Sequence, residues 1–504
     1  MWRTPSWLWL ALAAAALVRV AWLADKPLWR DEAWVAVLAR DPVRFFDPPM
    51  RPVPVGFLAL TALALRVPAL PAEVALRLIP LAAGLATVAL VPVLARALGA
   101  RAGTASAATW LAAGMPALVY YSRELKPYAL DALVAVVVPW LAWRAFAADE
   151  RRGGGSRDEL ALATVLVLSP WLTFGTVFAI AATLGWAGWR AWTHPPARLP
   201  WARLFLVYAL SFGAAYSLVL RDQSAHPRLR QYARRDVVAM QERVWPATFA
   251  RAAARYVQTA LPYAFPGLAL PAAALVVAGA LRWPRPSRGL LLWQSAGTAG
   301  LAAIAATLGQ YVLTRSRLLL FALPALALLA AAGLAFTAEM LARWTRRSWA
   351  AGGAAALAAA VALAWSGDAL ARRVAPQPRV PAYFRYDVLQ DVEPVIAEAA
   401  RRAAPSEPVI TSRYSGEQFR FYARGRLPQT FICTRTNCRD EGPPMRAWLE
   451  GVTDRGWMIL LAEEDRPWRR QAVVHSGFDV REAAAGRGTR LWEIRRVAAG
   501  GAAP

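Results

Sequence analysis

The sequence predicts a polytopic α-helical membrane protein that ends in a small α/β domain. Of its 504 residues, 57% are hydrophobic, which is above the roughly 45–50% apolar usage of soluble domains, and the mean hydropathy is +0.32. Apolar runs of about 17–25 residues, each long enough to cross a bilayer, recur between Trp7 and Trp365. The stretch from Asp368 to Pro504 is polar. We therefore expect a transmembrane module over residues 1–366 and a separate domain over 367–504.

About eleven transmembrane helices are expected. The first run, Trp7 to Ala24, has no small-residue cleavage site before the polar loop, so it is interpreted as a span and not a signal peptide. Val53 to Val67 is short and surrounded by prolines, which indicates a juxtamembrane or re-entrant helix. Leu160 to Trp192 is too long for one span and is divided near Ser169-Pro170-Trp171. The other runs are expected at 76–98, 104–120, 128–146, 201–220 and 261–281, before Gln310, after Arg317, and at 349–365.

The distribution of arginine orients these spans. Short loops on one side carry arginine, as cytoplasmic loops do, and they lie near residues 101, 152, 198, 285 and 346. The N-terminus is then cytoplasmic, and the loops 25–52 and 221–256 lie on the outer side. An odd number of spans places the C-terminal domain there too. The 221–256 arm mixes arginines with apolar side chains, which predicts an interfacial amphipathic helix.

The polar tail has the pattern of a small α/β domain. It alternates apolar runs of strand length with helical segments: strands at 408–411, 457–461 and 491–494, the last as an edge strand, and helices at 393–403 and 417–423. Cys433 and Cys438 follow in the same domain and are expected to form a disulfide in an oxidising compartment, with two unpaired thiols as the alternative.

Composition also excludes several classes of function. The formal net charge of +25 is explained by arginines in short loops that face lipid headgroups, so membrane lipids and not nucleic acid are the expected partners. The chain has two cysteines and three scattered histidines, so a metal site built from these side chains is not expected.

Ionisable side chains gather on the predicted outer face. The motif Trp29-Arg30-Asp31-Glu32-Ala33-Trp34 follows the first span, where carboxylates are poorly tolerated without a function. The alternative is a solvated loop end with interfacial tryptophans. A carboxylate can take a proton from a hydroxyl, and cations can hold a phosphate as it leaves. Carboxylates and cations on one face therefore predict a glycosyltransferase with a lipid-phosphate donor. Besides Asp31 and Glu32, the charged residues on this face are Glu124, Arg51, Arg123, Lys126, Arg315 and Arg317.

Four motifs on this face, within about residues 1–340, carry a family resemblance. They are Asp31-Glu32, Arg77-Leu78-Ile79-Pro80 with Gly84, Tyr121-Ser122-Arg123-Glu124-Leu125-Lys126-Pro127-Tyr128, and Arg317-Leu318 with Pro324. With these motifs the sequence resembles the protein O-mannosyltransferase-like C-class glycosyltransferases, a family that includes lipid A aminoarabinose transferases and rhizobial lipopolysaccharide core transferases. It departs from them at Leu318, where tyrosine is usual, and Arg51-Pro52 stands where many members carry His-Pro or Lys-Pro-Pro.

The resemblance implies an inverting transfer of a sugar from a polyprenyl-phosphate donor to a hydroxyl of a cell-envelope lipid, polysaccharide or protein. Asp31 would be the base and Glu32 would assist or orient it. No cofactor is required, and a divalent cation stays open. The site would face the periplasm from a bacterial inner membrane. The implied donor-phosphate ligands are Arg51, Lys126, Arg315 and Arg317, and the implied lining residues are Arg123, Glu124, Tyr128 and Tyr311.

The main alternative is a transporter or flippase of a lipid-linked substrate. Such proteins carry ionisable residues in the middle of spans or broken helices in two similar halves, and the sequence shows no such halves. Individual residues also have simpler explanations. Arg315 or Arg317 would anchor to headgroups, Glu124 would pair with a neighbouring cation, and Tyr128 would be an interfacial aromatic.

Overall fold

A computed structural model gives the fold of the protein. The residues that the structure describes are 6–21, 23–24, 27–46, 53–148, 157–194, 197–221, 245–313, 316–345, 350–374, 391–411, 415–423, 425–427, 430–432, 448–461 and 467–497. All structural statements below concern these residues.

The chain divides into two compact units. Unit 1 comprises Met1–Leu23, Pro42–Leu70 and Val74–Arg379, and unit 2 comprises Ala24–Asp41, Pro71–Glu73 and Val380–Pro504. The segment that carries Asp31 and Glu32 is therefore grouped with the polar tail. The domain boundary at residue 366 stays a prediction, and each unit is described by itself.

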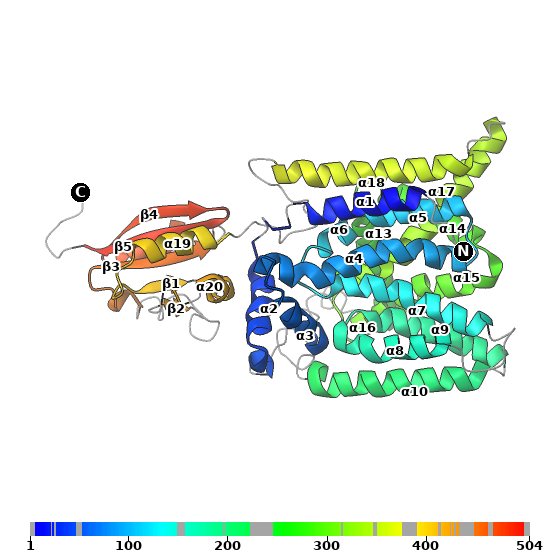
Figure 1. The fold of residues 1–504 in the computed structure, drawn as a ribbon, viewed down its shortest axis with the longest axis horizontal. Coiled ribbons are helices and arrows are strands. Elements are labelled where there is room, and N and C mark those ends of the chain that lie inside the picture. The colour runs from blue at the N-terminus through cyan, green and yellow to red at the C-terminus, as the bar shows by residue number, and fades with distance from the viewer. Residues whose placement is uncertain are drawn as a thin grey trace. The chain divides into compact units, whose positions relative to one another are not determined.

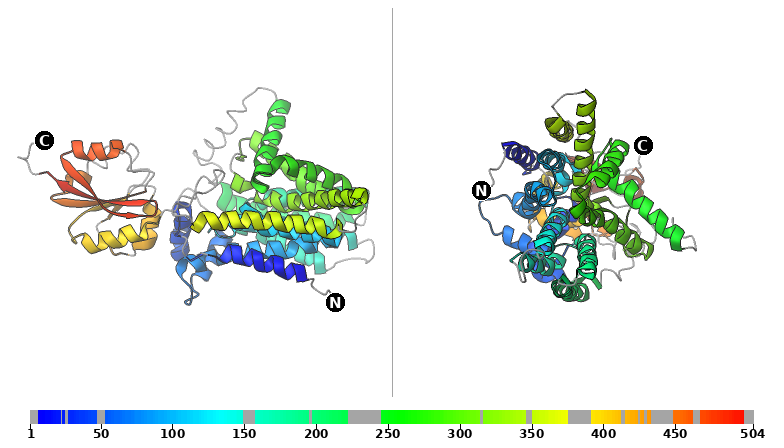
Figure 2. Two further views of the ribbon diagram at one scale, coloured as in Figure 1. Left: turned by 90° about the horizontal axis from the view of Figure 1, so that it is seen from above. Right: turned by 90° about the vertical axis from the view of Figure 1, so that its right-hand side faces the viewer.

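Unit 1 is a bundle in which long helices run side by side, as the two orientations in Figures 1 and 2 show. The apolar runs form helices because a helix satisfies the backbone N–H and C=O groups of the segment by internal hydrogen bonds, as a membrane requires. Two 3-10 segments, η1 (Pro42–Phe46) and η5 (Ser316–Ala322), and two π-helical segments, η3 (Tyr216–Leu220) and η4 (Trp293–Gly297), connect or extend them. The α-helices are α1 (Ser6–Val20), α3 (Val55–Ala64), α4 (Ala72–Ala97), α5 (Ala102–Gly114), α6 (Pro116–Tyr121), α7 (Tyr128–Ala148), α8 (Arg157–Leu172), α9 (Thr176–Thr193), α10 (Arg198–Ala215), α13 (Trp245–Ala264), α14 (Ala269–Arg282), α15 (Arg285–Leu292), α16 (Thr298–Thr307), α17 (Leu323–Thr345) and α18 (Ala350–Val374).

Within the described residues, five helical stretches are long and apolar enough to cross a membrane. The pair α13 and α14, bent by 105°, makes six if it counts as one span, and α1 and α3 are shorter apolar helices. The polytopic, mainly helical fold is confirmed, whereas the number of eleven spans and their orientation stay predictions.

The ends of the helices agree with the predicted division of the apolar runs at one position and differ from it at others. The predicted division near Ser169-Pro170-Trp171 is confirmed, because α8 ends at Leu172 and α9 begins at Thr176. The run expected at 104–120 is wrong as a single helix: α5 ends at Gly114 and Pro116 begins α6, the first-turn position that proline favours.

The run expected at 261–281 is also divided, between α13 and α14. Gly267 lies in the connecting turn with φ +76°, a backbone conformation that glycine adopts without steric cost. In the arm predicted at 221–256, residues 222–244 lie outside the described part, and residues 245–256 belong to α13.

Two glycines allow α14 and α17 to approach closely. A Cβ atom placed on Gly279 would lie 1.9 Å from the carbonyl oxygen of Leu329, and one on Gly333 would lie 2.0 Å from that of Leu275. The contact is reciprocal, so each helix presents a glycine to the other helix's backbone. Small residues promote this packing in membrane helices, where apolar burial does not distinguish protein from lipid.

Unit 2 contains a five-stranded mixed sheet with the order β2-β1-β3-β5-β4. β1 pairs in parallel with β2 and β3, and β5 pairs antiparallel with β3 and β4. Figure 2 shows helices α19 and α22 on opposite faces of this sheet. The elements are α2 (Arg30–Arg40), α19 (Glu393–Arg402), β1 (Val409–Thr411), α20 (Gly416–Ala423), β2 (Thr430–Ile432), β3 (Arg455–Leu461), α22 (Pro467–His475), β4 (Phe478–Gly486) and β5 (Thr489–Arg496).

The α/β pattern of the tail is confirmed, with one correction. Strand 491–494 was expected at an edge, but β5 lies between β3 and β4. The physical reason is that Leu491, Trp492 and Ile494 are all buried, as in a central strand covered on both faces. The edge strand β4 was missed because its apolar alternation is interrupted by a bulge between Glu482 and Ala484.

Candidate functional site

The acidic motif forms the first turn of helix α2 in unit 2. Asp31 and Glu32 both lie in that turn, where the backbone N–H groups and the helix dipole favour negative charge. Apolar side chains at Ala33, Val35 and Ala36 are fully buried, which fixes the face that α2 turns inward. The sequence therefore places two carboxylates at a stable helix start and not in an irregular loop.

The two carboxylates have different surroundings. Glu32 is 0% exposed, and its carboxylate accepts a hydrogen bond of 3.4 Å from the backbone N–H of Trp29, as the third residue of a capping box does. The Asp31 side chain is 22% exposed and pairs with Arg30 at 3.4 Å. Glu32 thus closes the helix start, whereas the carboxylate of Asp31 is partly exposed and pairs with Arg30.

The second predicted segment connects α6 to α7 in unit 1 and is buried throughout. Arg123, Glu124 and Lys126 are each at most 4% exposed. Arg123 donates a hydrogen bond of 2.6 Å to the carbonyl oxygen of Ala21, just beyond the end of α1. The backbone N–H of Lys126 donates to the carbonyl of Glu124 at 2.7 Å, which tightens the turn. This segment is built into the interior of the unit.

Two further arginines donate hydrogen bonds to backbone carbonyls in the same part of unit 1. Arg77 donates to the carbonyl of Leu23 at 3.3 Å. Arg19 donates to the carbonyl of Ala113 at 2.7 Å and to the hydroxyl of Ser122 at 3.2 Å. Guanidinium groups bind such carbonyls at helix ends, where they have no intrahelical partner. We call Arg19, Arg77 and Arg123 the arginine cluster.

The arginine cluster explains the glycine of the second motif. A Cβ atom on Gly84 would lie 1.9 Å from the Ser122 hydroxyl oxygen and 3.5 Å from Nε of Arg19. Only glycine therefore leaves room for the hydrogen bond between Arg19 and Ser122. Two motifs that are distant in the sequence meet here through one close contact.

Aromatic rings gather beside Arg317 in unit 1. The guanidinium carbon of Arg317 lies 6.0 Å from the centre of the Tyr128 ring, within the range of a cation–π interaction. Tyr128 contacts Tyr121 edge to face at 5.2 Å, and the charges of Glu124 and Arg317 both act on Tyr121. The structure thus brings together four of the residues in the predicted motifs.

Tyr311 lies near Tyr128 and Arg317, but it contacts Leu318 and Phe178. Its hydroxyl donates to the carbonyl of Leu318 at 2.5 Å, and its ring packs on Phe178 at 4.6 Å. It therefore fixes the start of η5, the segment that carries Arg317.

Sequence reasoning missed Asp131, which is buried one turn after Tyr128. Its carboxylate accepts hydrogen bonds from the Thr173 hydroxyl and from the backbone N–H groups of Gly175 and Thr176. It therefore caps the N-terminus of α9 from another helix. A Cβ atom on Gly175 would lie 2.7 Å from the Asp131 carboxylate. The sequence signal that could have identified Asp131 is the presence of an acidic residue within an apolar run.

Several predicted residues cannot be placed. Arg51, Arg315, Cys433 and Cys438 lie outside the described residues, so their roles as phosphate ligands and as a disulfide stay predictions. Within the described part of the chain, no three histidine, cysteine or acidic side chains form a group that could hold a metal ion.

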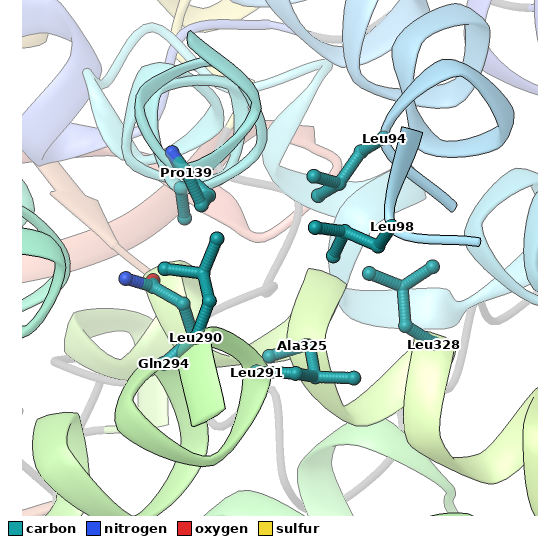
Figure 3. A pocket seen from close by; sticks show the side chains of 9 residues that line it. Leu94, Leu98, Pro139, Leu290, Leu291, Gln294, Ala325 and Leu328 are labelled. Atoms are coloured by element: carbon teal, nitrogen blue, oxygen red, sulfur yellow. The ribbon is translucent and has the colours of Figure 1, made fainter. Parts of the chain in front are cut away.

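A narrow cavity of about 10 Å³ lies elsewhere in unit 1. Figure 3 shows that leucine side chains from α4, α15 and α17 point into it. Its polar member, Gln294, donates hydrogen bonds to the Thr183 hydroxyl at 2.6 Å and to the Ala179 carbonyl at 3.1 Å. None of the predicted site residues lines this cavity, so it is separate from the candidate site.

Comparisons with known proteins give a structural likeness. No protein-family model matches the sequence, and no curated protein does. The fold is similar to crystal structures of ArnT from Cupriavidus metallidurans, with a TM-score of 0.58 at 14% identity in the apo state, covering 97% of both chains. With undecaprenyl phosphate bound, the TM-score is 0.60 at 14% identity, covering 97% of this chain and 98% of that chain.

A second likeness is to the archaeal oligosaccharyltransferase AglB from Archaeoglobus fulgidus in complex with an inhibitory peptide and a dolichol-phosphate. The TM-score is 0.53 at 12% identity, covering 96% of this chain and 73% of that chain. At these identities the likeness establishes the fold. The chain thus shares its fold with ArnT and AglB, in agreement with the family resemblance of its sequence motifs.

Proposed function

We propose that this protein is an inverting glycosyltransferase that moves a hexosyl or pentosyl group from a polyprenyl-phosphate donor to a cell-envelope hydroxyl. The reaction takes place at the outer face of a bacterial inner membrane. The observation that carries the proposal is the fold likeness over 97% of the chain to a structure that holds undecaprenyl phosphate. The partial exposure of the Asp31 carboxylate and the position of Arg317 beside the Tyr128 ring support the proposal.

In the proposed step, an oxygen of the acceptor hydroxyl attacks the anomeric carbon of the donor sugar. The bond from that carbon to the phosphate oxygen breaks, and its electron pair leaves with polyprenyl phosphate. The hydroxyl proton moves to the Asp31 carboxylate, which acts as general base. Attack from the face opposite the phosphate inverts the anomeric configuration.

The donor phosphate is the proposed ligand of Arg317, with Arg51, Lys126 and Arg315 as further cations. Guanidinium groups bind phosphate through charge-assisted hydrogen bonds and stabilise the charge that develops as it leaves. Arg317 is held beside Tyr128, and Tyr311 fixes the backbone next to it. Leu318 stands where the resembled family usually carries tyrosine. It contacts the Tyr311 hydroxyl through its backbone carbonyl.

The test measures the leaving group, because every sugar donor of this class releases the same product. The protein is placed in lipid nanodiscs with a panel of undecaprenyl-phosphate hexoses and pentoses and an envelope extract as acceptor. Release of undecaprenyl phosphate is followed by mass spectrometry. Arg317→Ala should raise the donor KM, lower kcat, or both, by roughly 10–100-fold in kcat/KM. Arg343→Ala, in the last turn of α17, is the matched control.

Two outcomes would count against the proposal. Movement of the intact donor across the bilayer of sealed proteoliposomes, without release of undecaprenyl phosphate, would identify a flippase. Wild-type turnover with unchanged kinetics in Arg317→Ala would exclude phosphate contact at that residue.

A further inference from the structure

Helix α20 of the C-terminal tail holds the backbone just before Asp31. The backbone N–H of Leu28 donates a hydrogen bond of 2.9 Å to the Tyr422 hydroxyl, and the Gln418 side-chain amide donates one of 3.0 Å to the Leu28 carbonyl. Gln418 and Tyr422 lie four residues apart, so they occupy the same face of α20. Both polar groups of one buried residue are therefore fixed by neighbouring turns of a single helix.

The other end of α2 is held by the same helix. Arg40 donates a hydrogen bond of 2.6 Å to the carbonyl of Phe421, and its guanidinium carbon lies 3.5 Å from the centre of the Phe421 ring. Contacts at both ends of an eleven-residue helix restrict sliding along its axis and rotation about it. The Glu32 cap then fixes the first turn relative to Trp29.

We propose that Gln418 and Tyr422 are positioning residues for Asp31, so that α20 sets the orientation of the catalytic carboxylate. The inference rests on the proposed function, because it assigns Asp31 the role of base. Leu28 lies three residues before Asp31, so a change in the backbone at Leu28 moves the start of the helix that carries the carboxylate. The tail then contributes to turnover without supplying a group to the reaction.

The experiment compares Tyr422→Phe and Gln418→Met with the wild-type full-length protein. Both substitutions keep the side-chain volume nearly constant and remove one hydrogen bond to Leu28. Arg420→Gln is the control, because Arg420 lies on the same helix and pairs with Glu417 at 2.8 Å instead. Amide hydrogen exchange of residues 28–40 and release of undecaprenyl phosphate are measured for each protein.

We expect faster exchange at Leu28 in Tyr422→Phe, because that amide loses its acceptor, and a kcat lowered by about 10–100-fold with an unchanged donor KM. Combining Tyr422→Phe with Asp31→Asn should lower the rate no further than Asp31→Asn alone, because both changes act through one carboxylate. If Tyr422 had a purely structural role, its substitution would instead lower the rate of the Asp31→Asn variant further, so that the two rate effects multiply.

The outcomes separate this inference from the proposed function. If wild-type protein releases undecaprenyl phosphate and Tyr422→Phe and Gln418→Met keep full kcat, the positioning role is wrong and the transferase stands. If the effects of Tyr422→Phe and Asp31→Asn multiply, the positioning role is also wrong. If the wild-type protein releases none with any donor, the proposed function is wrong, and the catalytic part of the inference fails with it.

Discussion

The start of α2 and the stretch 122–131 both carry ionisable residues, but they use them differently. In α2, Asp31 is partly exposed at a helix N-terminus, whereas Arg123, Glu124, Lys126 and Asp131 are all buried. Arg123 and Asp131 bind backbone groups of other helices. The comparison teaches that an ionisable side chain in this protein is not by itself a sign of catalysis. Arg123 and Asp131 are buried and bind backbone groups, whereas the carboxylate of Asp31 is partly exposed.

The largest structural effect is expected at Asp131. Asp131→Ala removes the acceptor of the Thr173 hydroxyl and of two backbone N–H groups at the start of α9. Leaving these donors buried without a partner should destabilise the protein by about 3 kcal/mol. Thermal unfolding in detergent measures the change, and Asp131→Asn, which keeps one acceptor oxygen, should lose less. An unchanged unfolding temperature in Asp131→Ala would remove Asp131 from the set of structural charges.

A smaller effect is expected at Gly84. Gly84→Ala places a Cβ atom against the Ser122 hydroxyl and should destabilise unit 1 by about 1–3 kcal/mol through overpacking. Adding Ser122→Gly should make the double variant more stable than the sum of the two single effects, because the clash disappears. Gly300→Ala is the control, since a Cβ atom there meets nothing within 4 Å. Strict additivity of the pair would show that the contact is absent.

The smallest effect concerns the pH dependence of stability and lies at Glu407 in unit 2. Burial acts to raise the pKa of Glu407, but hydrogen bonds from Trp457 and Arg455, each 2.7 Å, outweigh it, so the pKa lies below its usual value. A depressed carboxyl pKa stabilises the fold above the unfolded pKa of about 4.3 and loses that contribution as the pH falls through the folded pKa.

Hydrogen exchange of β3 in the full chain should therefore show a decrease in opening free energy as the pH drops below about 4.3. Glu407→Gln should be less stable than wild type at neutral pH and flatter across the acidic range. Equal slopes in the two proteins would assign the acid sensitivity to other groups.

The sequence predicted the fold class because hydropathy and run length determine which segments become membrane helices. It predicted the break after Pro170 but not those at Met115 and Gly267, since a single proline or glycine within an apolar run is compatible with a continuous helix. The edge position of β5 was wrong because pairing order depends on a neighbour, β4, whose own pattern is weak.

The site was only partly predictable for a similar reason. The motifs made Asp31, Tyr128 and Arg317 candidates, but they did not indicate which charged side chains bind backbone groups. Arg19 and Asp131 bind partners more than 40 residues away in the chain, and tertiary contacts of this kind leave no local periodicity. The contacts of Gln418 and Tyr422 with Leu28 were not predicted, because both residues lie in an ordinary amphipathic helix.

The central claim is that Asp31 performs chemistry while its neighbour Glu32 holds the helix start. The most direct measurement compares Asp31→Asn with Glu32→Gln for both the rate of undecaprenyl phosphate release and the unfolding temperature. The account predicts that Asp31→Asn lowers the rate by roughly 10²–10⁴-fold with little change in unfolding temperature. Glu32→Gln should lower the unfolding temperature and keep most of the rate. Full turnover in Asp31→Asn would contradict the account.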